Sequence, residues 1–161
     1  MLMTRSMSDP KLDLNLQFAV KKYKRPRRSS FRRWAKAALM LDAEVALRVV
    51  DEAEGRTLNR DYRGKDYATN VLTFAYGAAA ENGRLSGDIV ICAPVAAREA
   101  AEQGITLEAH FAHLTVHGML HLQGYDHETD AEAVTMESIE SFIMRRLGYS
   151  DPYDTPAVVD D

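Results

Sequence analysis

Three histidines lie close together in the chain, at His117, His121 and His127, with the spacing H-x3-H-x5-H. Residues four apart lie on one face of an α-helix, so the imidazoles of His117 and His121 can reach the same ion. Gly124 tolerates a positive φ, and a sharp turn there can bring His127 back toward the pair. Three nitrogen ligands with an open fourth position are typical of a catalytic zinc site. We therefore predict that these histidines bind one zinc ion, although three imidazoles also suit nickel, copper or iron.

His113 lies one helical turn before His117 and is an alternative candidate for the third metal ligand. If His113 replaced His127, the three ligands would span two helical turns, about 12 Å along the helix. Zinc–nitrogen bonds of about 2 Å cannot bridge that distance. We therefore expect His113 to lie next to a ligand, in the core, or against the substrate. His113 and Asp126 are the candidates for a general base, since the sequence offers no obvious one.

The residue after the first histidine limits the chemistry. The spacing matches the metzincin frame H-E-x-x-H-x-x-G-x-x-H, in which the glutamate activates water for peptide hydrolysis. Gly118 occupies that position here and can carry no proton. The metal is therefore expected to act by lowering the pKa of its bound water and by polarising the substrate. A zincin-type metalloprotease is an alternative, which Gly118 argues against.

Length and composition bound the organisation of the chain. Its 161 residues, 46% of them hydrophobic, suffice for one domain with a substantial core. We expect an ordered core over about 12–153, a frayed start and a disordered acidic tail from Asp151. No apolar run is long enough to cross a membrane, no secretory signal is visible, and the single Cys92 cannot form an internal disulfide. These features favour a cytoplasmic protein.

The charge is distributed unevenly along the chain. Residues 1–33 contain ten Lys or Arg and two Asp or Glu, whereas residues 34–161 contain ten and twenty-two. The basic segment 21–33 can bind the phosphate groups of nucleic acids electrostatically. The alternative interpretation is a solvated charged loop before a helix, and the sequence does not separate the two.

Hydrophobic patterns predict the elements that position these residues. Four strands are expected, at 12–20, 44–50, 71–74 and 87–92, with a loop at 77–87. Five helices are expected, one from about Phe31 with Ser30 as its cap, then 52–62, 94–103, 106–123, and one from Asp130 to Gly148. The histidine pair falls on the helix at 106–123, so the other elements must hold that helix in place.

The histidine segment resembles the signature of a known family. His117 to His127 reads HGMLHLQGYDH, which is similar to the H-G-x-L-H-L-x-G-Y-D-H signature of the YbeY endoribonucleases. Two further segments agree, because 58–74 resembles the family's L-N-x-x-Y-R-x-K-D-x-x-T-[ND]-V-L-S-F and 87–89 matches its G-D-I. Thr73 stands where that pattern has serine, a mild departure. The resemblance covers roughly 12–153, and a basic run like that of the N-terminal segment is not expected of the family.

The resemblance implies a fold and a function. YbeY members have an α+β zincin-like fold, so we expect a single domain with a mixed four-stranded sheet packed with about five helices. They are zinc-dependent endoribonucleases specific for single strands, which mature the 3′ end of 16S ribosomal RNA and take part in other rRNA processing and ribosome quality control. The expected partners are single-stranded RNA, above all ribosomal RNA, and the small ribosomal subunit with its proteins, without DNA or a membrane. A non-catalytic ribosome assembly factor with structural zinc is a second alternative.

The resemblance also implies roles for individual residues. The signature histidines imply that His117, His121 and His127 hold the metal. The arginine of the Y-R-x-K-D motif implies a catalytic role for Arg63. Arginine suits this role because its planar fork binds phosphate bidentately and stays charged while charge builds on the phosphoryl oxygens.

Two questions about the charged residues at 61–66 stay open in the sequence. Arg63 has an alternative role, a surface ion pair with Asp61 or Asp66, because exposed pairs of this kind are common. Lys65 is a candidate for a second phosphate contact. Only the placement of these side chains can decide between the two roles of Arg63.

Overall fold

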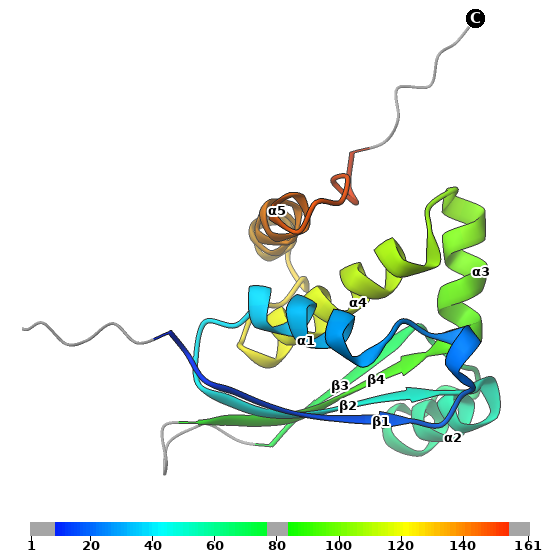
Figure 1. Cartoon of the computed structure of the whole chain (residues 1–161). Coiled ribbons are helices and arrows are strands. Elements are labelled where there is room, and N and C mark those ends of the chain that lie inside the picture. The colour runs from blue at the N-terminus through cyan, green and yellow to red at the C-terminus, as the bar shows by residue number, and fades with distance from the viewer. Residues whose placement is uncertain (1–8, 77–83, 155–161) are drawn as a thin grey trace, which may run out of the picture.

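The computed structural model describes residues 9–76 and 84–154 of the chain (Figure 1). Within these ranges lie four strands, five α-helices and one short 3-10 helix. The strands are β1 (Leu12–Phe18), β2 (Ala43–Val50), β3 (Val71–Ala75) and β4 (Leu85–Cys92). The helices are η1 (Lys22–Lys24), α1 (Arg28–Ala37), α2 (Glu52–Arg63), α3 (Ala93–Gln103), α4 (Leu107–Leu122) and α5 (Asp130–Arg146).

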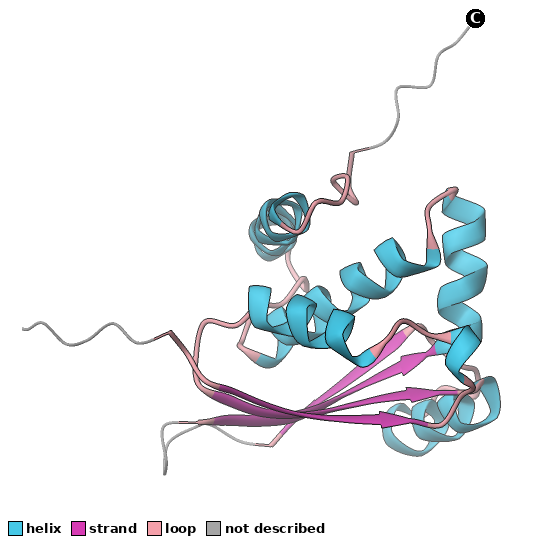
Figure 2. Cartoon of the chain, in the orientation of Figure 1, coloured by secondary structure: helices cyan, strands magenta, loops and turns pink. Residues whose placement is uncertain are grey.

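The four strands form one mixed sheet in the order β1-β2-β4-β3 (Figure 2). β1, β2 and β4 run parallel, and β3 lies antiparallel to β4 at the edge. Thr73 of β3 is paired with Ile89 of β4. The prediction of an α+β domain with a mixed four-stranded sheet and about five helices is confirmed.

Helices cover the two faces of the sheet unequally (Figure 1). α1, α3, α4 and α5 lie on one side, with α4 against β3 and β4 and α5 beyond α4, whereas α2 lies on the other side. Sheet and helices enclose α4, and its side chains Phe111, Val116, Met119 and Leu120 are completely buried. Burial of each such side chain contributes about 1.5–3 kcal/mol. This packing holds the helix that carries the histidine pair.

Two local features set the start of α4 and its distance from the sheet. Thr106 caps the helix, because its side-chain oxygen accepts a hydrogen bond from the N–H of Ala109 at 3.0 Å. Gly118 lets α4 lie close to β4, since a Cβ at this position would lie 3.1 Å from atoms of the Ile89 side chain. A larger residue at 118 would push the helix away from the sheet, at a cost of about 1–3 kcal/mol.

The predicted cap of α1 is wrong. The helix begins at Arg28, so Ser30 already lies inside its first turn. Arg27 takes the N-cap position, where the backbone is extended, with φ −79° and ψ 163°, and its side chain makes no capping hydrogen bond. A cap must lie just outside the helix, and Pro26 places that boundary earlier than the serine suggested.

Two other predictions about local structure also change. β4 begins at Leu85, so the end of the loop predicted at 77–87 is strand, while residues 77–83 lie outside the described residues. The acidic tail was predicted to be disordered from Asp151, but residues 151–154 form a turn in which Asp151 accepts a hydrogen bond from Ser141 of α5 at 2.6 Å. Residues 1–8 and 155–161 lie outside the described residues. Across residues 9–76 and 84–154, every helix is too short or too polar to span a lipid bilayer.

Candidate active site

A cavity of about 290 Å³ opens beside β3, near the C-terminal end of α4. Its walls come from the end of α2, from β3, from α4 and from the segment that leads to α5. The lining residues are Arg63, Val71, Thr73, His117, His121, Asp126, His127 and Glu128. The structure therefore brings all three predicted metal ligands and the predicted catalytic arginine to one cavity.

The three histidine rings form a triangle. The rings of His117 and His121 are stacked on α4, with centroids 6.4 Å apart and an interplanar angle of 3°. The ring of His127 lies 5.5 Å from that of His117 and 6.2 Å from that of His121. Imidazoles on one tetrahedral zinc have centroids about 5 Å apart, because each Zn–N bond is about 2 Å long. The triangle is somewhat wider than that, and no three His, Cys, Asp or Glu side chains of the described residues already stand as the ligands of one ion.

The chain turns back after α4 at the predicted glycine. Gly124 has a φ of 104°, which favours glycine over residues with a side chain. The N–H of Tyr125 donates to the carbonyl oxygen of Leu120 at 3.1 Å, and the N–H of His127 donates to Oδ1 of Asp126 at 2.7 Å. This turn brings His127 to the same cavity as the pair on α4.

Hydrogen bonds on the outer nitrogen orient two of the three rings. Nδ1 of His117 lies 2.7 Å from Oε2 of Glu140, and Nδ1 of His121 lies 3.1 Å from the carbonyl oxygen of Tyr125. Both partners accept hydrogen bonds, so each of these two rings, when neutral, carries its proton on Nδ1 and keeps a lone pair on Nε2. Metal-binding histidines usually have such a second contact. The donor types of all three rings, and the orientation of His117 and His121, therefore fit a divalent metal ion.

Arg63 does not form the surface ion pair that was its alternative role. Asp66 pairs with Arg56, with Oδ1 2.8 Å from Nε, and Asp61 pairs with Arg60 at 3.3 Å. Both acidic candidates thus have other arginine partners. Arg63 lines the cavity instead, and one N–H of its guanidinium donates to the carbonyl oxygen of Thr73.

The other candidates from the sequence divide into two groups. Asp126 and Glu128 line the cavity, and they are its carboxylates among the described residues. His113 and Lys65 are absent from the described lining. Of the two general-base candidates, only Asp126 therefore lies where a reacting group could meet it.

The family model described as endoribonuclease YbeY matches residues 15–148 of the chain. The chain belongs to the endoribonuclease YbeY family. The protein named endoribonuclease YbeY from Methylobacillus flagellatus is 62% identical over 146 residues, which are 91% of this chain and 96% of that protein. Proteins of the same name are 65% identical in Aromatoleum aromaticum, over 80% of this chain and 81% of theirs, and 56% identical in Nitrosomonas europaea, over 90% and 87%. A solved structure of TM1509 from Thermotoga maritima is 24% identical, with a TM-score of 0.49 over 88% of this chain and 99% of that one.

The three YbeY motifs are not all at the cavity. Arg63 of the second motif and the histidines of the signature line it together. The G-D-I motif lies on β4, outside the described lining, and its Asp88 accepts a hydrogen bond from the O–H of Tyr76. This hydrogen bond is the first cause of a raised pKa of the Tyr76 hydroxyl. The third motif therefore lies outside the described lining of the cavity.

The glycine of the YbeY signature argues against the metalloprotease alternative. Gly118 lies against β4, where a Cβ would approach Ile89 to 3.1 Å. The metzincin frame has its catalytic glutamate at this position. A glutamate here would meet the side chain of Ile89 unless α4 moved away from the sheet.

The basic segment 21–33 lies next to β1, at the opposite edge of the sheet from β3. The guanidinium carbon of Arg25 lies 3.6 Å from the ring centroid of Phe18. Arg28 and Arg32 donate hydrogen bonds to backbone carbonyls of β1. Several of these arginines therefore support the edge strand, a structural use that neither interpretation of the sequence predicted. The binding of RNA by this segment stays a prediction.

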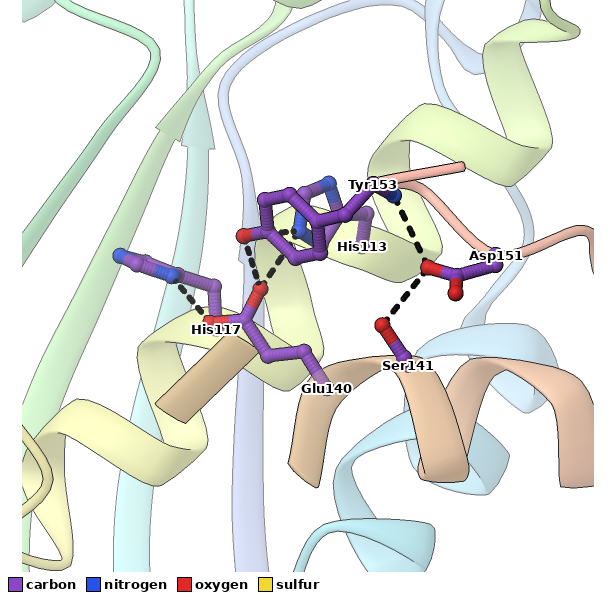
Figure 3. A network of polar contacts seen from close by, with 6 residues as sticks. All are labelled: His113, His117, Glu140, Ser141, Asp151 and Tyr153. Carbon is purple, nitrogen blue, oxygen red and sulfur yellow. Dashed lines mark hydrogen bonds and ion pairs between the residues drawn. The ribbon is translucent and has the colours of Figure 1, made fainter. Parts of the chain in front are cut away.

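Glu140 of α5 is a residue of the site that no sequence motif indicated (Figure 3). Its side chain is completely buried and contacts both His113 and His117. Burial raises the pKa of the Glu140 carboxyl, but hydrogen bonds with His113, His117 and Tyr153, together with electrostatic attraction to His117, outweigh burial and lower the pKa to about 2. One signal was available in the sequence, because Glu140 falls on the apolar stripe of α5, where a hydrophobic residue is expected.

Proposed function

We propose that this chain is a metal-dependent endoribonuclease that cleaves single-stranded RNA, with zinc as its metal. The observation that carries this proposal is that Arg63 lines the same cavity as the three histidines, although it lies far from them in the chain. Relatives that are 62%, 65% and 56% identical are named endoribonucleases, which supports RNA as the substrate.

Each basic group at the cavity has a task in phosphodiester cleavage. His117, His121 and His127 would hold the ion, which when bound supplies Lewis acidity toward a phosphoryl oxygen or a water. Arg63 would hold the scissile phosphate, because it is charged and lines the cavity. One N–H of Arg63 donates to the carbonyl oxygen of Thr73 at 3.3 Å, which leaves other N–H groups for two parallel hydrogen bonds to phosphate.

A carboxylate would accept the proton of the attacking group, which is a water or the 2′-hydroxyl of the RNA. We assign this role to Asp126 or Glu128, which line the cavity. The backbone N–H of His127 donates to Oδ1 of Asp126 at 2.7 Å and so orients that carboxylate. His113 is the weaker candidate, because its Nε2 lies 2.6 Å from a Glu140 oxygen.

We propose ribosomal RNA as the natural substrate. Maturation of the 3′ end of 16S ribosomal RNA and ribosome quality control are the proposed processes, with the small ribosomal subunit and its proteins as partners and the cytoplasm as the place of action. The three motifs shared with YbeY endoribonucleases support this assignment. Single strands are the expected form, because a flexible strand can present its phosphate to a cavity more easily than a stiff A-form duplex.

The test is cleavage of an end-labelled RNA that spans the 3′ end of 16S ribosomal RNA. The same sequence is offered as single-stranded RNA, as duplex RNA and as single-stranded DNA. Wild type is expected to cleave only the single-stranded RNA and to lose activity with a chelator. Arg63→Ala is expected to lower kcat/KM about 10²–10³-fold, because one lost donor to a developing charge costs that much.

Arg60→Ala is the matched control. Arg60 lies in the same last turn of α2 but pairs with Asp61, and it is expected to leave cleavage unchanged. Equal cleavage by wild type, Arg63→Ala and His127→Ala would overturn the proposal, since it would indicate a contaminating nuclease. Chelator-sensitive cleavage of a peptide library would favour the metalloprotease alternative instead.

A further inference from the structure

One buried carboxylate joins the proposed metal site to the last helix (Figure 3). Glu140 of α5 has no exposed side-chain surface. Its Oε2 lies 2.7 Å from Nδ1 of His117, and its Oε1 lies 2.6 Å from Nε2 of His113 and 2.5 Å from the hydroxyl of Tyr153. A single carboxylate thus accepts hydrogen bonds from α4 and from the segment that follows α5.

The segment after α5 is folded so that Tyr153 reaches this carboxylate. Asp151 accepts a hydrogen bond from the hydroxyl of Ser141 at 2.6 Å and from the N–H of Tyr153 at 2.9 Å. The ring of Tyr153 lies edge-on to that of His113, with centroids 5.3 Å apart. These contacts give Glu140 three donors, so the buried charge is compensated.

We propose that Glu140 is a positioning residue that holds His117 in the tautomer protonated on Nδ1 and thereby presents Nε2 to the metal. A carboxylate only accepts hydrogen bonds, so a neutral His117 that faces it must carry its proton on Nδ1. Figure 3 shows the other ring nitrogen of His117 on the far side from Glu140. The metal is the one of the proposed function, on which this part of the inference rests, whereas the tautomer is a property of the metal-free chain.

Glutamine at position 140 is the informative substitution. It keeps the shape of glutamate but has one acceptor oxygen and one N–H donor group. It can accept from His113 or from His117, and it presents an N–H to the other ring. Where that ring is His117, its proton moves to Nε2, which then faces the cavity with a hydrogen in place of a lone pair.

The first measurement is the tautomer of His117 in the metal-free full chain. Long-range proton–nitrogen correlation NMR at neutral pH distinguishes a ring protonated on Nδ1 from one protonated on Nε2. His117 is expected to be protonated on Nδ1 in wild type and to gain a fraction protonated on Nε2 in Glu140→Gln. A wild-type His117 protonated on Nε2 would overturn the proposal, whether or not the variant folds.

Glu137→Gln is the matched control for this measurement and for the measurement of zinc affinity described next. Glu137 is an exposed glutamate on the same helix, about one turn before Glu140. The control is expected to keep the His117 tautomer of wild type. A change of tautomer in Glu137→Gln as large as that in Glu140→Gln would overturn the specific role of Glu140.

The second measurement is zinc affinity, by competition of the folded full chain with a chromogenic chelator. Glu140→Gln is expected to weaken zinc binding about 10–100-fold, Tyr153→Phe less, and Glu137→Gln not at all. Equal zinc affinity of wild type and Glu140→Gln would overturn the positioning role and leave the proposed function intact. Failure of wild type itself to bind zinc would overturn the metal in the proposed function, while the tautomer still decides the role of Glu140.

Discussion

Two of the histidine–carboxylate contacts of α4, that of His110 near its start and that of His117 nearer its end, use different ring nitrogens. Nε2 of His110 lies 2.7 Å from Oε1 of Glu99 on α3, whereas Nδ1 of His117 lies 2.7 Å from Oε2 of Glu140 on α5. The second nitrogen of His110, Nδ1, is buried and has no hydrogen-bond partner in the part of the chain that the structure describes. His117, by contrast, lines the cavity.

The pair near the start of α4 serves the fold. The side-chain amide of Asn70 donates to both oxygens of Glu99, at 3.0 and 3.3 Å, and the N–H of Val71 donates to Oδ1 of Asn70 at 2.6 Å. Glu99 therefore connects α3 and α4 to the start of β3. A buried histidine beside a carboxylate is not in itself a functional site. The second ring nitrogen of His110 is buried, whereas His117 lines the cavity, and this separates the pair that supports the fold from the pair that we propose supports a metal ligand.

The largest difference between the two pairs is expected in metal binding. His117→Ala removes a proposed metal ligand, so zinc affinity is expected to fall by more than the roughly 100-fold typical of losing an outer partner. Cleavage of single-stranded RNA is expected to fall with it. Chelator competition and the cleavage assay check this, with circular dichroism as the control for folding. Unchanged zinc affinity in a folded His117→Ala protein would contradict the proposal that the His117–Glu140 pair serves metal binding.

The matching change near the start of the helix is His110→Ala. It is expected to lower the free energy of unfolding by about 2–3 kcal/mol, because it removes a buried side chain and a hydrogen-bond partner of Glu99. Zinc affinity is expected to stay at the wild-type value. Urea denaturation and chelator competition measure the two quantities on the same preparation. A loss of zinc affinity comparable to that of His117→Ala would show that the pairs are not separate in function.

The smallest expected effect is that of Glu99→Gln. Glutamine keeps the shape of the side chain but weakens hydrogen bonds that the charge had strengthened, so the free energy of unfolding should fall by about 1 kcal/mol. Zinc affinity should not change, unlike in Glu140→Gln. Glu102→Gln, an exposed glutamate on the same helix, is the control and should leave stability unchanged. The distinction between structural and positioning carboxylates would fail if Glu99→Gln weakened zinc binding as much as Glu140→Gln.

The sequence predicted the residues that line the cavity better than it predicted the residues that hold them in place. The three histidines lie close together in the chain. Helix geometry and a turn at Gly124 were therefore enough to predict that their rings lie near one another. Glu140 and Tyr153 lie far from these histidines in the chain, so only the packing of α5 on α4 brings them together. Local patterns carry no information about such a contact.

Competition between similar side chains also limited the prediction. Whether Arg63 pairs with Asp61 or Asp66 depends on where Arg56 and Arg60 point, because all three arginines lie on α2. In the structure Asp66 pairs with Arg56 and Asp61 pairs with Arg60. The arginines of the basic segment likewise contact β1, a strand whose edge position follows from the order of the whole sheet. Both outcomes depend on tertiary arrangement rather than on residue type.

Glu140 is synthesised after the histidines, after Arg63 and after both carboxylates of the cavity. Because a chain emerges from its N-terminus and tends to fold in that order, α4 can form before α5 is available to pack on it. In such a nascent chain His117 has no buried acceptor, and its proton is free to occupy either ring nitrogen. A protein proposed to cut ribosomal RNA would thus complete its site only after α5 has emerged from the ribosome that makes it.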